Sequence, residues 1–359
     1  MHCHGLILHL AVWTLAWAVE NVTLTWDLSG CGEYPIYSAP PLVPLPPGLS
    51  GRGVQLAATI GLRAVDSLAE STVAPGLQET AYSKFDGRAF LSPTFSWQAA
   101  LTSCVASHLV YEEAAFVERT CKNRFGLSCR FLESNATQCF VAHDNRLVLV
   151  AFRGSQGVAD WIANLKVTSR PTTIRNIHAG FYEAFQDVRA ALDNLIEPLI
   201  ANRILIFTGH SLGGAVATIA AAYWHRKYNI RAVYTFGQPR VDLNSFKAYV
   251  NDNRIDQAFY RIVNADDIVS RIPPRYVHVG HHFRFDAQGV ASQLEGVPPT
   301  VSTSERPSLS FEEFETLRTA CEYASNSQVE ALFPNYFGDH RLQGYLAKIL
   351  KQVQSADST

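Results

Sequence analysis

The stretch LIFTGHSLGGA, residues 205–215, joins an apolar run to an alanine-rich run through a serine between glycines. Ser211 stands at the centre of the pattern G-x-S-x-G, with Gly209 before it and Gly213 after it. In a tight strand-to-helix turn of this kind, the serine hydroxyl projects at the carboxyl edge of a sheet, and the helix N-terminus that follows stabilises a developing oxyanion. We therefore predict that Ser211 is a nucleophile. The alternative is a glycine-rich turn that carries an inert serine.

Outside this turn, apolar runs of strand length alternate with segments of helical periodicity. The helical segments are 182–200 and 213–228, and the apolar runs are 146–152, 203–207, 231–236 and 258–263. Runs that are apolar on both faces are typical of a sheet that is covered on both sides. The alternation predicts a three-layer α/β fold with a central, mostly parallel sheet.

Composition places the chain among globular proteins and gives no sign of a nucleic-acid partner. Of its 359 residues, 47% are hydrophobic and 17% are charged, with a formal net charge of −2. Such a balance does not favour nucleic acid or an anionic membrane as the main partner. No cysteine pair has the C-x-x-C spacing of zinc sites, so we expect neither a metal nor a cofactor.

The N-terminus indicates export. Residues 5–18 are apolar but too few to span a bilayer comfortably, and they end in Ala16-Trp17-Ala18. We interpret residues 1–18 as a cleaved signal peptide of a secreted protein, although no lysine or arginine precedes the apolar run. The alternatives are an uncleaved anchor or a buried helix. Six cysteines remain beyond the signal, an even number that permits disulfides in an oxidising compartment.

We divide the remaining chain by its composition. Proline-rich sequence marks an N-terminal segment, 19–53, and the α/β domain covers 54–353. Within this domain, 288–310 is predicted to be an irregular insertion, and 354–359 is a tail.

A serine nucleophile needs a base and an acid that orients the base, and in the common α/β arrangement these follow in the order Ser, Asp, His. Two neighbouring aspartates, Asp266 and Asp267, come directly after the run 258–263. Adjacent side chains rarely point the same way, so one of the two is expected to be solvated.

His340 is the candidate base because it lies late in the chain, where Pro334, Gly338 and Asp339 predict a loop that leads into a helix capped by Asp339. The remaining histidines of interest are assigned structural roles: His178, His210, His278, His281 and His282.

Two backbone amides are the predicted oxyanion donors. One is the amide of Leu212, which directly follows the nucleophile. The other belongs to Ser155, in a Gly154-Ser155 turn at the end of an earlier strand. The alternative for Ser155 is an ordinary turn residue.

With these motifs, the sequence resembles the class 3 lipases, a family of secreted fungal triacylglycerol lipases and their bacterial relatives. The resemblance implies an α/β-hydrolase fold and a triad of Ser211, Asp267 and His340, with Ser155 and Leu212 at the oxyanion. It also implies that Cys31 and Cys321 could tie the two ends of the chain together, as in some members. The matching pieces are VAFRGS, DWIANL, IHAGFYEAF, TGHSLGGA, TFGQPRV, RIVNADDIVSRIPP, HVG and DHRLQGYL.

The segment 156–165 is similar to the lid of that family. Its apolar residues Val158, Trp161 and Ile162 fall on one side of a short helix. In the lid interpretation, this side covers the acyl groove in water and turns outward at a lipid surface. The alternative is a short helix that is packed permanently on the sheet.

Together these features predict a secreted, metal-independent serine carboxylester hydrolase, a lipase on acylglycerols, which contacts its ester substrate at a lipid surface. Alternatives with the same triad are a phospholipase A1, a monoacylglycerol lipase and a feruloyl-type esterase. Alternatives of other kinds are a catalytically silent lipid-binding protein and a peptidase on the same fold. The sequence leaves the oligomeric state open.

Overall fold

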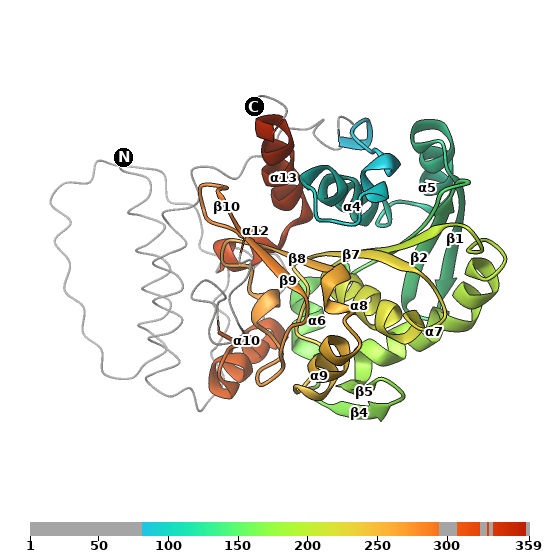
Figure 1. The fold of residues 1–359 in the computed structure, drawn as a ribbon. Helices are drawn as coiled ribbons and strands as arrows, with labels where there is room; N and C mark the ends of the chain where they lie inside the picture. The colour runs from blue at the N-terminus through green and yellow to red at the C-terminus, as the bar shows by residue number, and fades with distance from the viewer. Residues whose placement is uncertain (1–80, 294–306, 324–328, 330–332, 357–359) are drawn as a thin grey trace, which may run out of the picture.

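A central sheet organises the chain in the computed structural model, which describes residues 81–293, 307–323, 329 and 333–356 (Figure 1). The strands of the sheet follow the order β1-β2-β3-β6-β7-β8-β9-β10. Strands β3, β6, β7, β8 and β9 are parallel, whereas β1, β2 and β10 pair antiparallel at the two edges. The bounds are β1 (Ser128–Ser134), β2 (Thr137–His143), β3 (Leu147–Phe152), β6 (Ile204–His210), β7 (Ile230–Phe236), β8 (Phe259–Asn264), β9 (His281–Phe285) and β10 (Ala291–Gln293).

Helices cover both faces of this sheet (Figure 1). On one face lie α4 (Trp97–Leu109) and α13 (Leu342–Ala356), and on the other lie α7 (Ala179–Ile196) and α8 (Leu212–Trp224). The other elements are η1 (Gly87–Leu91), α5 (Ala114–Thr120), η2 (Cys121–Phe125), α6 (Val158–Asn164), the hairpin β4 (Ser169–Thr172) and β5 (Arg175–His178), α9 (Ser245–Asp252), η3 (Asp256–Ala258), η4 (Val269–Arg271), α10 (Phe311–Tyr323) and α12 (Pro334–His340).

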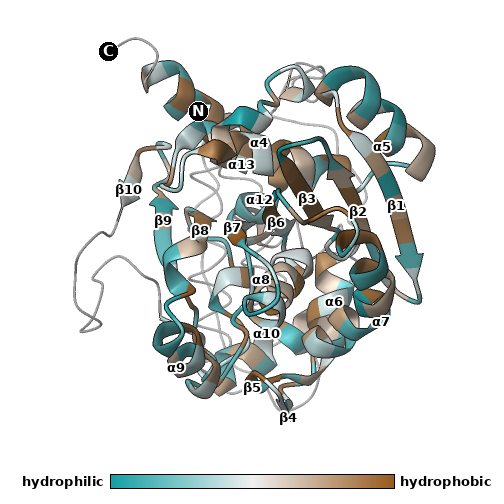
Figure 2. Cartoon of the chain, turned by 45° about the vertical axis from the view of Figure 1, so that its right-hand side comes forward, coloured by the Kyte–Doolittle hydropathy of each residue, from teal (hydrophilic) through white to brown (hydrophobic). Residues whose placement is uncertain are grey.

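The continuous apolar runs have the burial that two covered faces require. Val148 and Val150 of β3 belong to the cluster under α7 and α8, whereas Leu147 and Leu149 belong to the cluster under α4 and α13. Successive strand residues point to opposite faces, so both faces of β3 are apolar, as its colouring in Figure 2 shows. The predicted three-layer α/β fold is therefore confirmed.

Two local predictions are wrong. The stretch 288–310 is not irregular throughout, because residues 291–293 form β10 by pairing with β9. The predicted loop before His340 is instead α12, which begins with Pro334 at its first helical position and ends at His340. A proline is tolerated there because the first turn of a helix leaves its amides unpaired in any case.

Several predictions fall outside the described residues. They include the signal peptide at 1–18, the segment 19–53, Cys31 and most of the insertion. The cysteines that the structure describes, at 104, 121, 129, 139 and 321, are free thiols. In the described part of the chain, no helix has the length and apolarity needed to cross a membrane.

Candidate active site

Ser211 occupies a strained turn between β6 and α8. Its backbone has φ 57° and ψ −131°, a conformation that residues other than glycine rarely adopt. Backbone strain of this kind is common at functional sites. The flanking glycines make this turn sterically feasible. A Cβ added at Gly209 would overlap the backbone of Gly213, and one added at Gly213 would overlap the Phe152 carbonyl at the end of β3. The turn is anchored by the Ser211 amide, which donates to the Phe236 carbonyl at 2.9 Å.

The structure brings Asp267 and His340 into direct contact, although 73 residues separate them. Nδ1 of His340 lies 2.8 Å from Oδ2 and 3.0 Å from Oδ1 of Asp267. Both side chains are buried, as is Ser211. Within the described part of the chain, Oγ of Ser211 and Nε2 of His340 have no hydrogen-bond partner. Oγ of Ser211 and Nε2 of His340 are thus both buried and without a hydrogen-bond partner among the described residues.

Asp266 points elsewhere. Its carboxylate accepts from the Arg284 guanidinium at 3.3 Å, and about a third of its side chain, 31%, is exposed. Its amide donates to the side chain of Asp339 at 3.0 Å. Asp339 therefore does not cap α13, as the sequence predicted, but holds the loop that carries the two aspartates.

The surroundings of Asp267 keep it ionised. Burial by itself raises the pKa of this carboxyl, but the charge and hydrogen bond of His340 and the hydroxyl of Tyr345 outweigh burial, so the pKa lies below its ordinary value. The Tyr345 hydroxyl donates to Oδ2 at 2.6 Å, and the Val269 amide donates to Oδ1 at 2.9 Å. A carboxylate held in this way orients the imidazole and stabilises its protonated form.

Gly237, at the end of β7, leaves the room that this pair needs. Its φ is 55°, a left-handed conformation that favours glycine. A Cβ at this position would collide with Oδ2 of Asp267 and with the imidazole of His340.

His210 positions His340 through its backbone. Nε2 of His210 lies 2.7 Å from the His340 carbonyl oxygen, and Nδ1 lies 3.0 Å from the Tyr111 hydroxyl. Burial, with the neighbouring His340 acting in the same direction, lowers the pKa of His210 to about 3, so the ring is neutral. Because a carbonyl only accepts, Nε2 carries the proton and Nδ1 accepts from Tyr111.

Sequence reasoning missed the contributions of Tyr111 and Tyr345, since nothing in their local sequence distinguishes them from core aromatics. Tyr345 had only the signal of an apolar position in a helical repeat.

Ser155 and Leu212 line one pocket of about 320 Å³. The backbone at Gly154, next to Ser155, lies close to Ser211, because a Cβ at Gly154 would meet the Tyr111 hydroxyl, the His210 carbonyl and the Ser211 side chain. The two residues predicted at the oxyanion therefore face a common space beside Ser211.

The histidines of the β9 region have environments that fit structural roles. His278 hydrogen-bonds the Ser270 carbonyl at 2.8 Å, and the ring of His281 stacks on Tyr260 at 5.6 Å. Burial, with Arg261 nearby, lowers the pKa of His278 and His282 well below the ordinary value.

Helix α6 carries the apolar residues predicted for the lid, and their side faces the core. Ile162 is fully buried, and Val158 and Trp161 pack against the same apolar cluster. The ring of Trp161 stacks on that of Phe181 with 6.2 Å between centroids.

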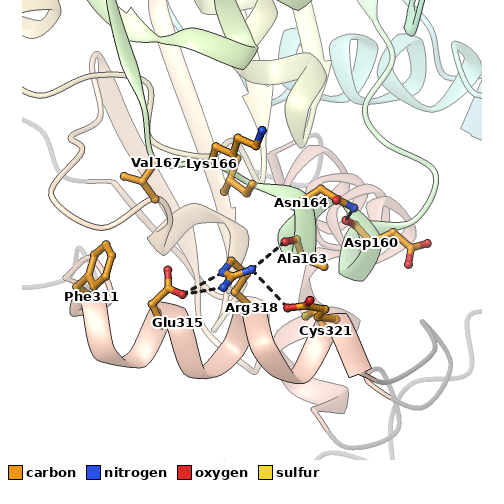
Figure 3. A pocket seen from close by; sticks show the side chains of 11 residues that line it. Asp160, Ala163, Asn164, Lys166, Val167, Phe311, Glu315, Arg318 and Cys321 are labelled. Carbon is orange, nitrogen blue, oxygen red and sulfur yellow. Dashed lines mark hydrogen bonds and ion pairs between the residues drawn. The ribbon is translucent and has the colours of Figure 1, made fainter. Parts of the chain in front are cut away.

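A second helix, α10, lies along α6 (Figure 3), a contact that the sequence did not indicate. Arg318 of α10 reaches the Ala163 carbonyl at 3.5 Å and pairs with Glu315 at 3.0 Å and Glu322 at 3.5 Å. A groove of about 600 Å³ remains between the two helices.

The sheet order, the strained serine after β6 and the aspartate after β8 are those of an α/β-hydrolase fold. Residues 149–277 match the family described as Lipase (class 3). This match extends over about a third of the chain and includes most of the motifs that carry the resemblance to the class 3 lipases.

Individual relatives cover only part of the chain. A secreted mono- and diacylglycerol lipase 1 of Fusarium solani is 38% identical over 143 residues, which cover 38% of this chain and 42% of the relative. A lipase of Rhizomucor miehei is 31% identical over 153 residues, 38% of this chain and 41% of the relative. This chain thus spans less than half the length of either curated relative. A solved triacylglycerol lipase with a serine-protease triad has a TM-score of 0.45 and 24% identity, over 52% of this chain and 79% of that one.

Proposed function

We propose that this protein is a serine carboxylester hydrolase that acts on acylglycerols. The observation that carries the proposal is the buried Asp267–His340 pair, whose free Nε2 accompanies the equally uncommitted Oγ of Ser211 at a strained turn. The match of residues 149–277 to the class 3 lipase family and the mono- and diacylglycerol lipase among the relatives support acylglycerols as the substrate class.

In the proposed reaction, Ser211 Oγ attacks the ester carbonyl while Nε2 of His340 takes its proton. Asp267 holds the imidazole with Nδ1 protonated and stabilises the imidazolium. The amides of Ser155 and Leu212 donate to the oxyanion of the tetrahedral intermediate. His340 then delivers its proton to the departing alcohol, and water hydrolyses the acyl-enzyme by the same steps.

The test combines turnover with labelling of the nucleophile. We expect a fluorophosphonate probe to label wild-type protein and not Ser211→Ala, and p-nitrophenyl butyrate to be hydrolysed only by the former. A protein that binds lipid without turnover would not label, and labelling at another serine would refute the assignment.

Neighbouring residues supply matched controls for the other two roles. Asp267→Asn favours the wrong imidazole tautomer and should lower kcat by about 10⁴, whereas Asp266→Asn should change it less than about twofold. His340→Ala should abolish turnover, while His282→Ala should act through stability alone. Sensitivity of Asp266 or His282 in place of its counterpart would reverse the assignment.

Helix α6 is proposed to act as a lid over the acyl groove. Its apolar side gains a lipid environment when it turns outward, and α10 would have to release it. Activity on a medium-chain triglyceride should then rise above the solubility limit more steeply than saturation kinetics allow. Trp161→Ala should reduce that rise, and a hyperbolic dependence that Trp161→Ala leaves unchanged would remove the lid from the mechanism.

Export is proposed from the apolar N-terminus and from the relative named as secreted. If residues 1–18 are removed, N-terminal sequencing of protein from the culture medium should begin at Val19. Intact Met1 in cell-bound protein would contradict export.

A further inference from the structure

The pocket lined by Ser155 and Leu212 has a polar wall on its other side. This wall comes from the β1–β2 hairpin and from the end of β3. Its principal polar side chains are Glu133, Gln138 and Arg153. An acyl chain would bury apolar surface against these groups and leave their hydrogen bonds unmade, which makes this wall a poor acyl groove. The pocket instead suits the polar part of an ester substrate.

The three side chains form one hydrogen-bonded row. Arg153 donates from Nη1 to Oε1 of Gln138, and Gln138 donates from Nε2 to Oε1 of Glu133 at 2.7 Å. The Arg153 guanidinium also lies over the Tyr111 ring, 5.4 Å from its centroid. Gln138 is thus held in place from both ends. The row offers donors at Arg153 and Gln138 and free acceptor positions at Glu133, a combination that matches a hydroxyl, which both donates and accepts.

The charge at this pocket discriminates against anionic groups. Glu133 stands in the wall, and Asp187 of α7 lies beside the same hairpin, where Asn135 donates to it at 2.9 Å and Thr137 at 3.4 Å. The pocket lining itself holds one arginine, Arg153, and one carboxylate, Glu133, and Asp187 adds a second carboxylate beside it. A phosphate brought here would meet like charges, whereas a neutral hydroxyl would not.

We propose that this pocket reads the free hydroxyls of the glyceryl group in a partial acylglycerol, with Gln138 and Glu133 as specificity-determining residues. The inference rests on the proposed function. It adds a substrate preference: the protein favours monoacylglycerols over esters whose alcohol has no free hydroxyl and over lysophospholipids.

The test compares 1-monooleoylglycerol with methyl oleate, which shares the acyl chain and lacks the hydroxyls. Both are presented in the same detergent micelles. Gln138→Met, of similar size and without the amide, should lower kcat/KM for monooleoylglycerol about five- to thirtyfold and change methyl oleate less than about twofold. The control is Gln352→Leu on α13, which loses one side-chain hydrogen bond. It should leave kcat/KM unchanged for both substrates.

A second variant tests the charge. Glu133→Gln should raise turnover of oleoyl lysophosphatidylglycerol relative to monooleoylglycerol by about threefold or more, because one like charge is removed. If the wild-type protein hydrolyses both oleoyl esters but Gln138→Met leaves their ratio unchanged, this inference is wrong and the proposed function stands. If the wild-type protein hydrolyses neither, the proposed function fails with it.

Discussion

Asp339 offers a stability test that depends on the environment of the site and not on turnover. It lies next to His340, is largely buried, and accepts a hydrogen bond from the Asp266 amide. Burial raises the pKa of its carboxyl from 3.8 to about 6, with Asp267 and Asp266 contributing in the same direction against the amide bond and Lys348. Asp339→Asn keeps an oxygen for the Asp266 amide and removes the charge.

The sign follows from proton binding. In the unfolded chain the carboxyl ionises near its ordinary value of 3.8, and in the folded chain near 6. Between these values the folded state binds more protons, so the free energy of unfolding falls as pH rises from about 4 to about 6 and stays low above that. The wild-type protein therefore carries the full cost of the buried charge at neutral and alkaline pH.

The pKa values set an upper limit on this cost. The rise from 3.8 to about 6 corresponds to about 3 kcal/mol at pH values above both. Because the side chain keeps some contact with solvent, we expect about 1 to 2 kcal/mol. At about pH 8, Asp339→Asn should be more stable than wild type by this amount. At about pH 4, the two proteins should have nearly the same free energy of unfolding.

The assay is urea unfolding followed by tryptophan fluorescence at the two pH values. Asp252→Asn, at an exposed position on α9, is the matched control and should have no pH-dependent effect. A stabilisation of Asp339→Asn that is equal at both pH values, or a loss of stability at about pH 8, would refute the reasoning.

Three further predictions concern groups around the site. Tyr345→Phe removes a hydrogen-bond donor from Asp267 and so raises the pKa of that carboxyl. We expect kcat on p-nitrophenyl butyrate to fall about tenfold and the acid side of the pH–activity profile to move to higher pH. An unmoved profile would contradict this role of Tyr345. Gly237→Ala should destabilise the protein by about 2 kcal/mol or more in urea unfolding and abolish turnover, because the new methyl group collides with the acid–base pair; full activity would show that the loop yields. Arg318→Ala frees the Ala163 carbonyl from α10, so triglyceride hydrolysis should begin at a lower lipid concentration while soluble-ester turnover stays within about twofold, and an unchanged onset would separate α10 from any lid movement.

Much of this protein could be read from local sequence. The strands at 146–152, 203–207, 231–236 and 258–263 are predicted correctly because each is a continuous apolar run, and a run that is buried on both faces has few alternatives. The turn at Ser211 is equally local, since the two glycines that relieve its strain lie within two residues of it. The expected order Ser, Asp, His along the chain then limits the candidates for the acid to Asp266 and Asp267.

What the local pattern left open depends on contacts between distant segments. Asp266 and Asp267 have the same chemistry and adjacent positions, and only the packing of α12 and α13 against the end of β8 turns one toward His340 and the other toward Arg284. Helix α12 was mistaken for a loop because glycine and proline are turn formers by propensity, which tertiary packing overrides.

The roles of the tyrosines and of the polar pocket also depend on contacts between segments that are distant in the chain. Tyr345 has the sequence signature of a core residue, and its hydroxyl gains a role only because the fold places Asp267 beside it. Gln138 and Arg153 meet because β2 and β3 pair in one register, which sets their side chains in the same pocket as Ser155 and Leu212. Periodicity within a segment determines which face it buries, but the partner that a buried polar atom meets is decided by strands and helices far away in the chain.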